Sequence, residues 1–347
     1  MRFYTGQHRY YCGIDLHART MYLCILDHES GQIVLHRNLR CEPQVFLRAV
    51  EPYRDGLVVG VECIFCWYWL ADLCTAEDIP FVLGHALYMK AIHGGKAKND
   101  KIDAHKIAVI LRGGAFPTAY VYPRGMRATR DLLRRRLLFV RRRSELFTHI
   151  RIIFHQLNLP APADRLREPR NRLGLLEAVP DPAVRANVEA DLELAERLDE
   201  IIRSLERTIC RRARVDDPET LELLKTIPGV GRVLALTLLY ELHDIDRFPR
   251  VGDFLSYARL VKSQKASAGK VTGTSGAKIG NAHLKWAYSE AAVLFLQKNP
   301  PGQRLIGRLR SKHGKGKALS ILAARLGRAS YYMLRRSTAF DMERFLN

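Results

Sequence analysis

Four carboxylates occupy places in the sequence from which they could bind divalent metal ions. Asp15 lies in the first β-forming run of the chain, and Glu62 ends a later apolar run. Asp100 and Asp103 are three residues apart, so they share one face if their segment is helical. Converging carboxylates can hold a pair of divalent ions, which activate a nucleophile and stabilise the leaving oxygen in phosphoryl transfer. The pattern therefore predicts a phosphoryl-transfer site, and its oxygen ligands favour Mg²⁺ or Mn²⁺.

Each of these acids also has a structural interpretation. Asp15 could simply close a strand, and Asp100 could cap a helix whose third position is Asp103. We favour metal binding because an acid on the first strand, an acid ending a later strand and an acid pair opening a helix occur together. Lys98 and Lys101 flank the acid pair, so we expect them to contact a phosphate backbone.

A strongly basic segment follows the acids. Between Arg124 and Arg151 there are ten arginines and two acids. So many like charges in adjacent helical turns repel one another, and a polyanion would relieve that repulsion; a solvated helix face is the alternative. Guanidinium forks bind phosphates bidentately, so such a helix can track a DNA duplex or a structured RNA. The candidate contacts are Arg127, Arg130, Arg134, Arg135, Arg141 and Arg142.

A glycine-rich turn in the last third could approach a phosphate closely. Its sequence is Ile227-Pro228-Gly229-Val230-Gly231. Gly229 and Gly231 would let the backbone come near the anion, and the amides that open the next helix could bind it. An ordinary turn between two helices is nearly as good an interpretation.

A serine in the segment Lys265-Ala266-Ser267-Ala268-Gly269-Lys270 is a candidate nucleophile. A metal or a base could activate Ser267 to attack a phosphodiester, although most loop serines only form turns. Other hydroxyls stand nearby, on Ser263, Thr274 and Ser275. The lysines expected to contact nucleic acid here are Lys265, Lys270 and Lys278.

Length and charge limit the classes of function. The 347 residues exceed one ordinary domain. The chain has 56 Lys and Arg against 36 Asp and Glu, a net charge of +20, which favours a polyanionic partner and salt-dependent binding. No run approaches the roughly 18 apolar residues of a membrane span, and the first residues lack the apolar part of a signal peptide. We therefore expect a cytoplasmic protein with no membrane partner.

The seven cysteines are an odd number and stand mostly in apolar segments. This placement fits reduced, buried thiols in a reducing compartment. Cys63 and Cys66 have the spacing of a CxxC pair, but no second pair follows at the distance that a zinc site needs. We expect neither a metal nor a redox role there.

The first third of the chain has the pattern of an α/β domain. Three β-rich runs are separated by turn signals, and a helix, a strand, a second helix and a short strand follow. This order is typical of one mixed sheet flanked by helices. The expected segments are residues 10–16, 21–27, 33–36, 46–53, 56–62, 67–76 and 80–83.

The remainder is predicted to be helical. Residues 127–157 and 183–214 have apolar stripes at helical spacing, and the two can pair as an antiparallel coiled-coil arm. Residues 221–226 and 232–242 flank the glycine-rich turn as a helix-hairpin-helix candidate. A loop at 262–280 and helices at 281–296 and 317–335 follow. The predicted domains are 1–125, 126–215 and 216–347.

Taken together, these segments resemble the DEDD transposases of the IS110 family, to which the Piv-type DNA invertases are related. The resemblance is collinear over nearly the whole chain. Its first half rests on Gly13-Ile14-Asp15-Leu16-His17, Val61-Glu62 and Lys98-Asn99-Asp100-Lys101-Ile102-Asp103-Ala104. Its second half rests on Thr226-Ile227-Pro228-Gly229-Val230-Gly231, Ser267-Ala268-Gly269-Lys270 and Lys278-Ile279-Gly280-Asn281-Ala282-His283-Leu284-Lys285.

The resemblance implies a fold and an activity. The fold would be an N-terminal RNase-H/RuvC-like domain, a helical arm that assembles subunits and a C-terminal transposase domain. The activity would be recombination of double-stranded DNA, at an element junction and a target, by a homo-oligomer (dimer or tetramer) that a structured bridge RNA guides. Carried over by motif, Asp15, Glu62, Asp100 and Asp103 would bind Mg²⁺, and Ser267 would form a transient phosphoserine link.

The serine segment departs from the family's usual pattern. That pattern has two serines followed by two glycines, whereas Ala266 and Ala268 replace the first serine and the first glycine here. Only Ser267 is then left as the nucleophile at this place. Further along, Ile279 stands where the family has a basic residue and Ala277 where it has a serine.

We therefore hypothesise an oligomeric DNA recombinase with a composite site, in which the metal-bound acids and Ser267 meet within one chain or between subunits. The first alternative is a RuvC-like, structure-specific nuclease that uses the four acids to activate water and needs no serine. The second is a non-enzymatic nucleic-acid-binding scaffold built on the basic arm.

Overall fold

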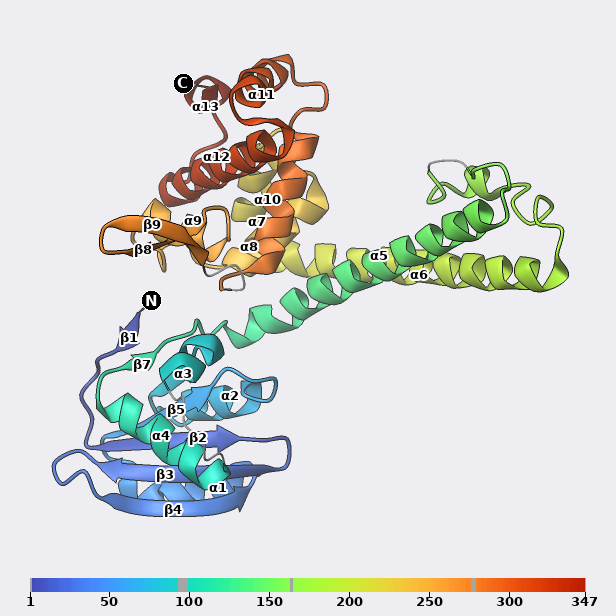
Figure 1. The fold of residues 1–347 in the computed structure, drawn as a ribbon. Helices are drawn as coiled ribbons and strands as arrows, with labels where there is room; N and C mark the ends of the chain where they lie inside the picture. Colours follow the sequence, from blue (N-terminus) through green and yellow to red (C-terminus); the bar gives the residue numbers. More distant parts are fainter. Residues whose placement is uncertain (1, 93–98, 163–164, 276–278, 347) are drawn as a thin grey trace. The chain divides into compact units, whose positions relative to one another are not determined.

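The computed structural model describes residues 2–92, 99–162, 165–275 and 279–346 (Figure 1). Its internal contacts divide the chain into two compact units, residues 1–124 and 125–347. This division makes no boundary between the predicted arm and the C-terminal domain, so the three-domain scheme stays a prediction.

The first unit is built on a mixed five-stranded sheet with the strand order β4-β3-β2-β5-β6. The β2–β3 and β3–β4 pairs are antiparallel, whereas β5 is parallel to both β2 and β6. The mixed sheet with flanking helices that the sequence predicts is therefore confirmed. The strands are β2 (Tyr10–Leu16), β3 (Thr20–Asp27), β4 (Ile33–Arg40), β5 (Leu57–Glu62) and β6 (Phe81–Gly84).

Helices cover both faces of this sheet. One face buries Cys12, Ile14 and Leu16 of β2 against two helices, α1 (Pro43–Val50) and α2 (Tyr68–Ala76). The opposite face buries Tyr11 and Val58 against α4 (Asp100–Arg112). Because side chains alternate along a strand, the odd-numbered residues of β2 and the even-numbered residues of β5 point toward α4. The unit also contains η1 (Glu51–Tyr53), α3 (Ala86–Ile92) and the small pair β1 (Phe3–Tyr4) with β7 (Phe116–Pro117).

The second unit is mainly helical around one large core. Its central helix, α8 (Arg232–Leu242), is buried on all sides from Leu234 onward, as expected for a helix that is apolar all round. The other helices of this core are α7 (Pro218–Lys225), α9 (Val251–Tyr257), α10 (Ala282–Leu294), α11 (Pro300–His313), α12 (Lys315–Arg336) and α13 (Met342–Leu346).

Two long helices, α5 (Arg124–Gln156) and α6 (Pro182–Asp216), extend from this core and pair with each other (Figure 1). Phe147, Ile150 and Phe154 of α5 share a small core with Val188 and Ala195 of α6. Three ion pairs cross between the helices, and residue numbers rise along α5 as they fall along α6, so the helices are antiparallel. These pairs are Arg136 with Glu206, Arg143 with Asp199, and His149 with Asp191. A short 3₁₀ helix, η2 (Pro169–Arg172), lies between the two long helices in the chain.

The loop predicted at residues 262–280 is in part a β-hairpin. Its strands are β8 (Ser263–Ser267) and β9 (Lys270–Ser275), which pair antiparallel. The turn residues Ala268 and Gly269 have φ values of 48° and 76°, as a two-residue type I′ hairpin requires. Small residues and lysines conceal the alternation by which a strand is usually recognised. Among the described helices, none combines the length and the apolar character needed to cross a bilayer.

Candidate functional site

Two glycines place Asp15 and Glu62 on the same face of the first unit's sheet. Gly13 and Gly60 are register partners in the parallel β2–β5 pair. A β-carbon on Gly13 would meet backbone atoms of α4, and one on Gly60 would meet the side chain of Leu111 in the same helix. Both glycines therefore face α4. Asp15 and Glu62 lie two residues further along their strands, so they point to that face as well.

The N-terminal turn of α4 presents the other two acids to the same region. Asn99 is the N-cap, and its side chain accepts a hydrogen bond from the Ile102 amide at 2.8 Å. The capping role considered for Asp100 therefore belongs to Asn99, and Asp100 is the first residue of the helix. Asp100 stands one turn before Ala104, which is fully buried on the sheet. Asp103 stands one turn before the equally inward Ile107, so both acids lie on the sheet side of the helix.

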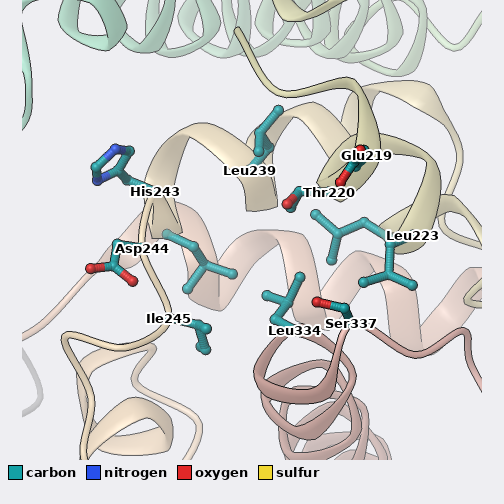
Figure 2. Close-up of a pocket in the computed structure, with 11 residues that line it drawn as sticks. Glu219, Thr220, Leu223, Leu239, His243, Asp244, Ile245, Leu334 and Ser337 are labelled. Atoms are coloured by element: carbon teal, nitrogen blue, oxygen red, sulfur yellow. The ribbon is translucent and has the colours of Figure 1, made fainter.

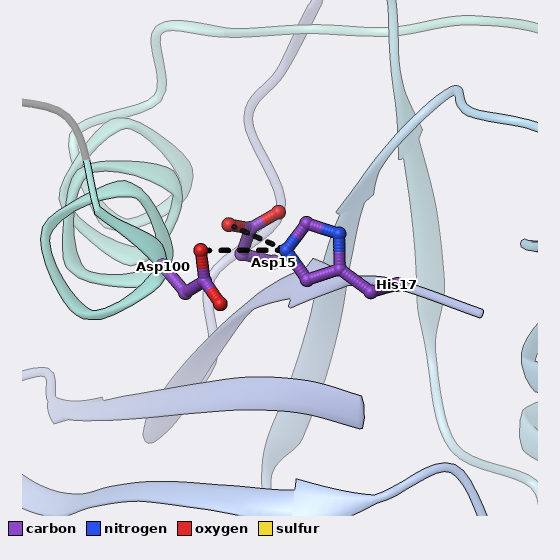
Figure 3. Close-up of side chains that lie close together, drawn as sticks. All are labelled: Asp15, His17 and Asp100. Atoms are coloured by element: carbon purple, nitrogen blue, oxygen red, sulfur yellow. Dashed lines mark ion pairs between the residues drawn. The ribbon is translucent and has the colours of Figure 1, made fainter. Parts of the chain in front are cut away.

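Three side chains come together at this place: Asp15, His17 and Asp100 (Figure 3). Nε2 of His17 lies 3.5 Å from Oδ2 of Asp15 and 3.4 Å from Oδ1 of Asp100. One ligand atom from each of the three residues lies within 4.8 Å of the other two. Two carboxylates and an imidazole at this spacing can hold a divalent cation.

The other two predicted metal ligands, Glu62 and Asp103, are not part of this group. The Asp103 carboxylate forms an ion pair with Lys106 at 3.6 Å, and Glu62 is half-buried at the end of β5. His17, in contrast, is a site residue that the chemical argument from sequence missed. It lies just beyond β2, so its position beside Asp100 depends on how α4 packs on the sheet. The sequence signal was only its spacing, two residues after Asp15.

Two thiols fix the chain at the end of β2. Sγ of Cys41 donates to the carbonyl of His17 at 3.3 Å, and Sγ of Cys66 donates to the carbonyl of Leu16 at 3.7 Å. Burial raises the pKa of Cys41 to about 11 and also raises the pKa of Cys66. Both groups therefore remain protonated donors at neutral pH. Cys66 thus has a structural role at the end of β2.

A buried glutamate pairs with two of the arginines of the basic helix α5. Glu241 of α8 is 1% exposed and accepts hydrogen bonds from three side chains. Arg130 Nε lies 3.0 Å from Oε2, Arg134 Nε 2.6 Å from Oε1, and Asn281 Nδ2 2.8 Å from Oε2. Burial alone would raise the pKa of Glu241, but the hydrogen bond from Arg134 and the charges of both arginines lower it to about 2. Arg130 and Arg134 therefore anchor α5 to the core of the second unit.

The predicted nucleic-acid contacts on α5 fall into two groups. Arg127 is 5% exposed, and Arg130 and Arg134 are directed inward at Glu241, so these three are poorly placed to meet a phosphate backbone. Arg135, Arg141 and Arg142 are exposed. Of the predicted lysines, Lys101 and Lys270 are exposed. Lys98 and Lys278 lie outside the described residues, and the side chain of Lys265 is likewise not described.

The serine hairpin exposes its turn. Ser267 is the last residue of β8 and is exposed, as are Ala268, Gly269 and Lys270. Because both turn residues have positive φ, Ala268 adopts a conformation that is unfavourable for a residue with a β-carbon. The hydroxyl of Ser267 therefore stands where a large substrate can reach it, beside one described lysine.

The two turn glycines before α8 have different roles. Gly229 has a φ of 80°, and a β-carbon there would lie 2.5 Å from the backbone of Leu294 and Phe295. Its small size is therefore needed for packing against the end of α10. Gly231 is the N-cap of α8, and a β-carbon there would meet nothing within 4 Å. The space in front of this helix N-terminus is open. Of the two glycines, Gly231 is therefore the one beside which an anion could bind.

A separate cavity of about 380 Å³ lies among α7, α8 and α12 (Figure 2). Its floor is formed by leucines, and its rim contains Glu219, His243, Asp244 and Ser337. Burial lowers the pKa of His243, so the imidazole is neutral at pH 7. Two carboxylates on the rim would repel a phosphodiester, and none of the predicted site residues lines the cavity. We do not assign the phosphoryl chemistry to it.

Two protein families match this chain. A family described as "Transposase", the DEDD type of the IS110 group, matches residues 12–158. A second, described as "Transposase IS116/IS110/IS902 family", matches residues 221–306. The first match contains all four acids, and the second contains the glycine-rich turn and Ser267.

Curated relatives agree with these matches. The transposase for insertion sequence element IS1111A of Coxiella burnetii is 25% identical over 82% of this chain and 77% of its own length. The transposase for IS1328 of Yersinia enterocolitica is 28% identical over 43% of this chain and 44% of its own length. An uncharacterized IS110 insertion-element protein of Streptomyces coelicolor is 30% identical over 34% of this chain and 30% of its own length. The chain thus spans less than half of two of these relatives. Because the two family matches follow one another in chain order, this protein belongs to the IS110/IS116/IS902 family of transposases and has an N-terminal DEDD domain.

Proposed function

We propose that this protein cuts and rejoins DNA strands, using a divalent-metal site at Asp15, Glu62, Asp100 and Asp103 and the hydroxyl of Ser267 as nucleophile. The observation that supports the metal site best is the group of Asp15, His17 and Asp100 at the end of β2, inside a DEDD domain. A DEDD domain implies a divalent cation. When bound, such an ion supplies charge stabilisation for a pentavalent phosphorus and acidifies the oxygen that attacks it.

The protein's own residues have distinct tasks in this proposal. Asp15, Glu62, Asp100 and Asp103 bind and orient the ion, and His17 contributes a nitrogen ligand or holds the two aspartates apart when no ion is bound. The oxygen of Ser267 bonds to phosphorus and loses its proton, while the bond from phosphorus to one deoxyribose oxygen breaks and that oxygen takes up a proton. Attack of another strand's hydroxyl on the phosphoserine then releases Ser267 and joins the strands.

The substrate would be held by exposed basic groups. Arg135, Arg141, Arg142, Lys101 and Lys270 are exposed, and the net charge of +20 supports a polyanionic partner. We include double-stranded DNA and a structured guide RNA as partners, with Gly231 at a helix-hairpin-helix contact and α5 with α6 as a coiled-coil arm that assembles a dimer or tetramer. The arm, residues 126–215, and the C-terminal domain, residues 216–347, would then act as separate functional parts.

A covalent-trapping assay tests the proposed reaction. Purified protein, Mg²⁺, DNA with the element junction and the flanking non-coding RNA are mixed, denatured and examined for protein-linked DNA. We expect an adduct that Ser267→Ala abolishes and that Ser263→Ala and Ser275→Ala, in the same hairpin, retain. Asp15→Asn should abolish the adduct as well. A Ser267→Ala variant with full recombination activity would exclude the serine mechanism.

Hydrolysis by metal-activated water is the second candidate. It is supported by the fact that Asp15, His17 and Asp100 all belong to the first unit, so a metal there needs nothing from Ser267. This function predicts cleaved DNA ends without attached protein, at equal rates in the wild type and in Ser267→Ala. The same gel therefore separates the two candidates.

A mixing experiment tests whether the site is composite between subunits. Asp15→Asn and Ser267→Ala are each expected to be inactive alone. If acids from one subunit act with Ser267 of another, a mixture of the two variants recovers a fraction of the wild-type adduct. If both parts of the site come from one chain, the mixture stays inactive.

A further inference from the structure

An arginine-lined pocket of about 400 Å³ lies in the second unit between α6 and the start of α8. Its lining consists of Arg207, Cys210, Arg211 and Arg232. The first three lie on two turns of α6, and Arg232 is the first residue of α8. We call this site the α6–α8 arginine pocket. None of the residues assigned above to the proposed function lines it.

The charges of this pocket are not balanced within the described part of the chain. Arg207, Arg211 and Arg232 are exposed, and no ion pair or hydrogen bond joins their guanidiniums to another described residue. Elsewhere in the unit, arginines such as Arg136 and Arg143 are paired with acids. Arg207 and Arg211 are four residues apart on one helix, where like charges repel. An anion between them would remove that repulsion.

The start of α8 adds to the positive potential. Gly231, its N-cap, makes no side-chain capping hydrogen bond, so the first amides of the helix lack a side-chain acceptor. The positive end of the helix dipole lies at the same place. Helix and arginines therefore favour an anion at this site for two independent reasons.

The chemistry of the lining indicates the class of anion. Guanidinium forks match the geometry of phosphate oxygens, and arginine is preferred over lysine where that match matters. The cavity is larger than a single phosphate needs, and it opens on the surface of a protein whose net charge is +20. We propose that the α6–α8 arginine pocket binds a backbone phosphodiester of the nucleic acid on which the protein acts. This inference rests on the proposed function, because the nucleic acid that supplies the phosphate is the substrate or guide named in that function.

Part of the proposed nucleic-acid surface lies on α6 rather than on α5. The sequence pattern favoured α5, but Arg130 and Arg134 of that helix bind the buried Glu241. On α6, Arg207 and Arg211 lie one turn apart and are both exposed. Exposed arginines without a described acidic partner therefore also lie where α6 meets α8.

A binding experiment without divalent metal tests the pocket separately from the chemistry. Fluorescence anisotropy with a labelled 30-base-pair DNA duplex, and with an RNA hairpin, is measured in EDTA over a range of salt concentrations. We expect Arg207→Gln, Arg211→Gln and Arg232→Gln each to weaken binding about three- to tenfold and to reduce the slope of log K against log salt by about 1. Arg203→Gln, an exposed arginine of α6 outside the pocket, is the matched control and should change affinity less than about twofold.

The two nucleic acids distinguish the source of the phosphate. Equal losses for duplex and hairpin identify a backbone phosphate common to both, and a loss confined to one identifies that one as the ligand. If the three pocket variants lose no more affinity than Arg203→Gln for either nucleic acid, the pocket is not a phosphate site. Circular dichroism melting confirms that each variant is folded as the wild type is.

Cys210 offers a second readout inside the pocket. Its thiol is half-buried among the arginines, so a bound strand should shield it from a maleimide. We expect nucleic acid to slow alkylation of Cys210 at least fivefold in the wild type and in Ser267→Ala, and not in the triple variant of Arg207, Arg211 and Arg232. An unchanged alkylation rate would overturn the proposal. Since neither assay needs strand transfer, failure of the trapping assay and failure of this one are separate results.

Discussion

A β-carbon at Gly13 would lie 2.3 Å from the backbone nitrogen of Ala108 and 2.4 Å from the carbonyl oxygen of Ala104. Strand β2 and helix α4 are therefore in backbone contact, with no room for a side chain between them. Asp15 lies two residues beyond Gly13, and Asp100 lies one turn before Ala104. The close approach of strand and helix is thus what brings the two carboxylates within reach of one cation.

Gly13→Ala should damage the first unit and its site together. The nearest neighbours of the added methyl group are backbone atoms of α4, so α4 must move away from the sheet. Overpacking of this kind lowers the free energy of unfolding by about 1–3 kcal/mol. We expect a value at the upper end of that range, because the neighbouring atoms belong to a rigid backbone. Urea denaturation followed by circular dichroism measures it. Gly252→Ala, in α9 with open space around it, is the control and should not destabilise the protein; equal stability of the two variants would contradict the prediction.

Asp100→Asn should weaken metal binding without unfolding the chain. Its carboxylate is exposed and faces His17 and Asp15, so its removal takes away one anionic ligand and no buried contact. We expect at least a tenfold lower affinity for Mn²⁺ by isothermal titration calorimetry. Asp27→Asn is the control, because Asp27 lies at the opposite end of the β2–β3 pair, where its carboxylate accepts hydrogen bonds from Ser30. Equal Mn²⁺ affinities for the two variants would remove the metal site from this place.

Glu241→Gln should strongly destabilise the second unit at neutral pH. The change leaves Arg130 and Arg134 beside an uncharged amide in a buried position. Breaking a buried ion pair by removing one partner costs about 3–5 kcal/mol. Glu222→Gln removes an exposed glutamate that pairs with Lys225 in the same unit, and it should cost less than about 1 kcal/mol. Guanidinium denaturation at pH 7 compares the two; a Glu241 effect as small as the Glu222 effect would contradict the role given to this cluster.

The contribution of Glu241 should disappear in acid. Its pKa is lowered from 4.5 to about 2 in the folded chain, so its stabilising effect is fully present above pH 4.5 and is lost as the pH falls through 2. The size of the shift corresponds to about 3 kcal/mol. The difference in unfolding free energy between wild type and Glu241→Gln should therefore shrink between pH 5 and pH 2. A difference that is constant over this range would show that Glu241 is not held ionised by its arginines.

Ala268→Gly should stabilise the serine hairpin. Ala268 has a φ of 48°, a conformation that costs a residue with a β-carbon about 1 kcal/mol and glycine almost nothing. Amide hydrogen exchange of β8 and β9 should slow by about fivefold, which corresponds to that energy. Gly269→Ala, at a φ of 76°, should change exchange in the opposite direction. Faster exchange in Ala268→Gly would show that the turn does not have this conformation.

The buried thiols should resist alkylation. Burial raises the pKa of Cys24 to about 11 and that of Cys74 to about 12, and it raises the pKa of Cys12 as well. Because the thiolate is the reactive form, iodoacetamide at pH 8 should modify the exposed Cys63 well before these three in the native protein. Peptide mass spectrometry gives the order, and denaturation in urea should make all of them react. Early modification of Cys74 would contradict the buried core of the first unit.

Local patterns in the sequence were enough to predict the five strands of the main sheet and the long helices of the second unit, but not β1, β7 or α3. The apolar, β-rich runs of β2, β3 and β5 arise from burial of these strands, and the apolar stripes of α5 and α6 arise from burial of one stripe; neighbouring residues alone reveal both patterns. The order of Asp15, Glu62, Asp100 and Asp103 was likewise visible, because strand ends and helix starts have local signals. The β8–β9 hairpin was missed, since its small and basic residues lack that alternation.

Only the tertiary structure decided which polar groups meet. His17 joined Asp15 and Asp100 because Gly13 lets α4 contact β2, whereas Asp103 formed an ion pair with Lys106. Arg130 turned inward to Glu241, 111 residues further along the chain. The ten arginines of α5 indicate a phosphate-binding surface. Their number alone does not reveal which of the guanidiniums instead pair with a buried acid. That choice depends on contacts between residues distant in sequence, and no local pattern specifies those contacts.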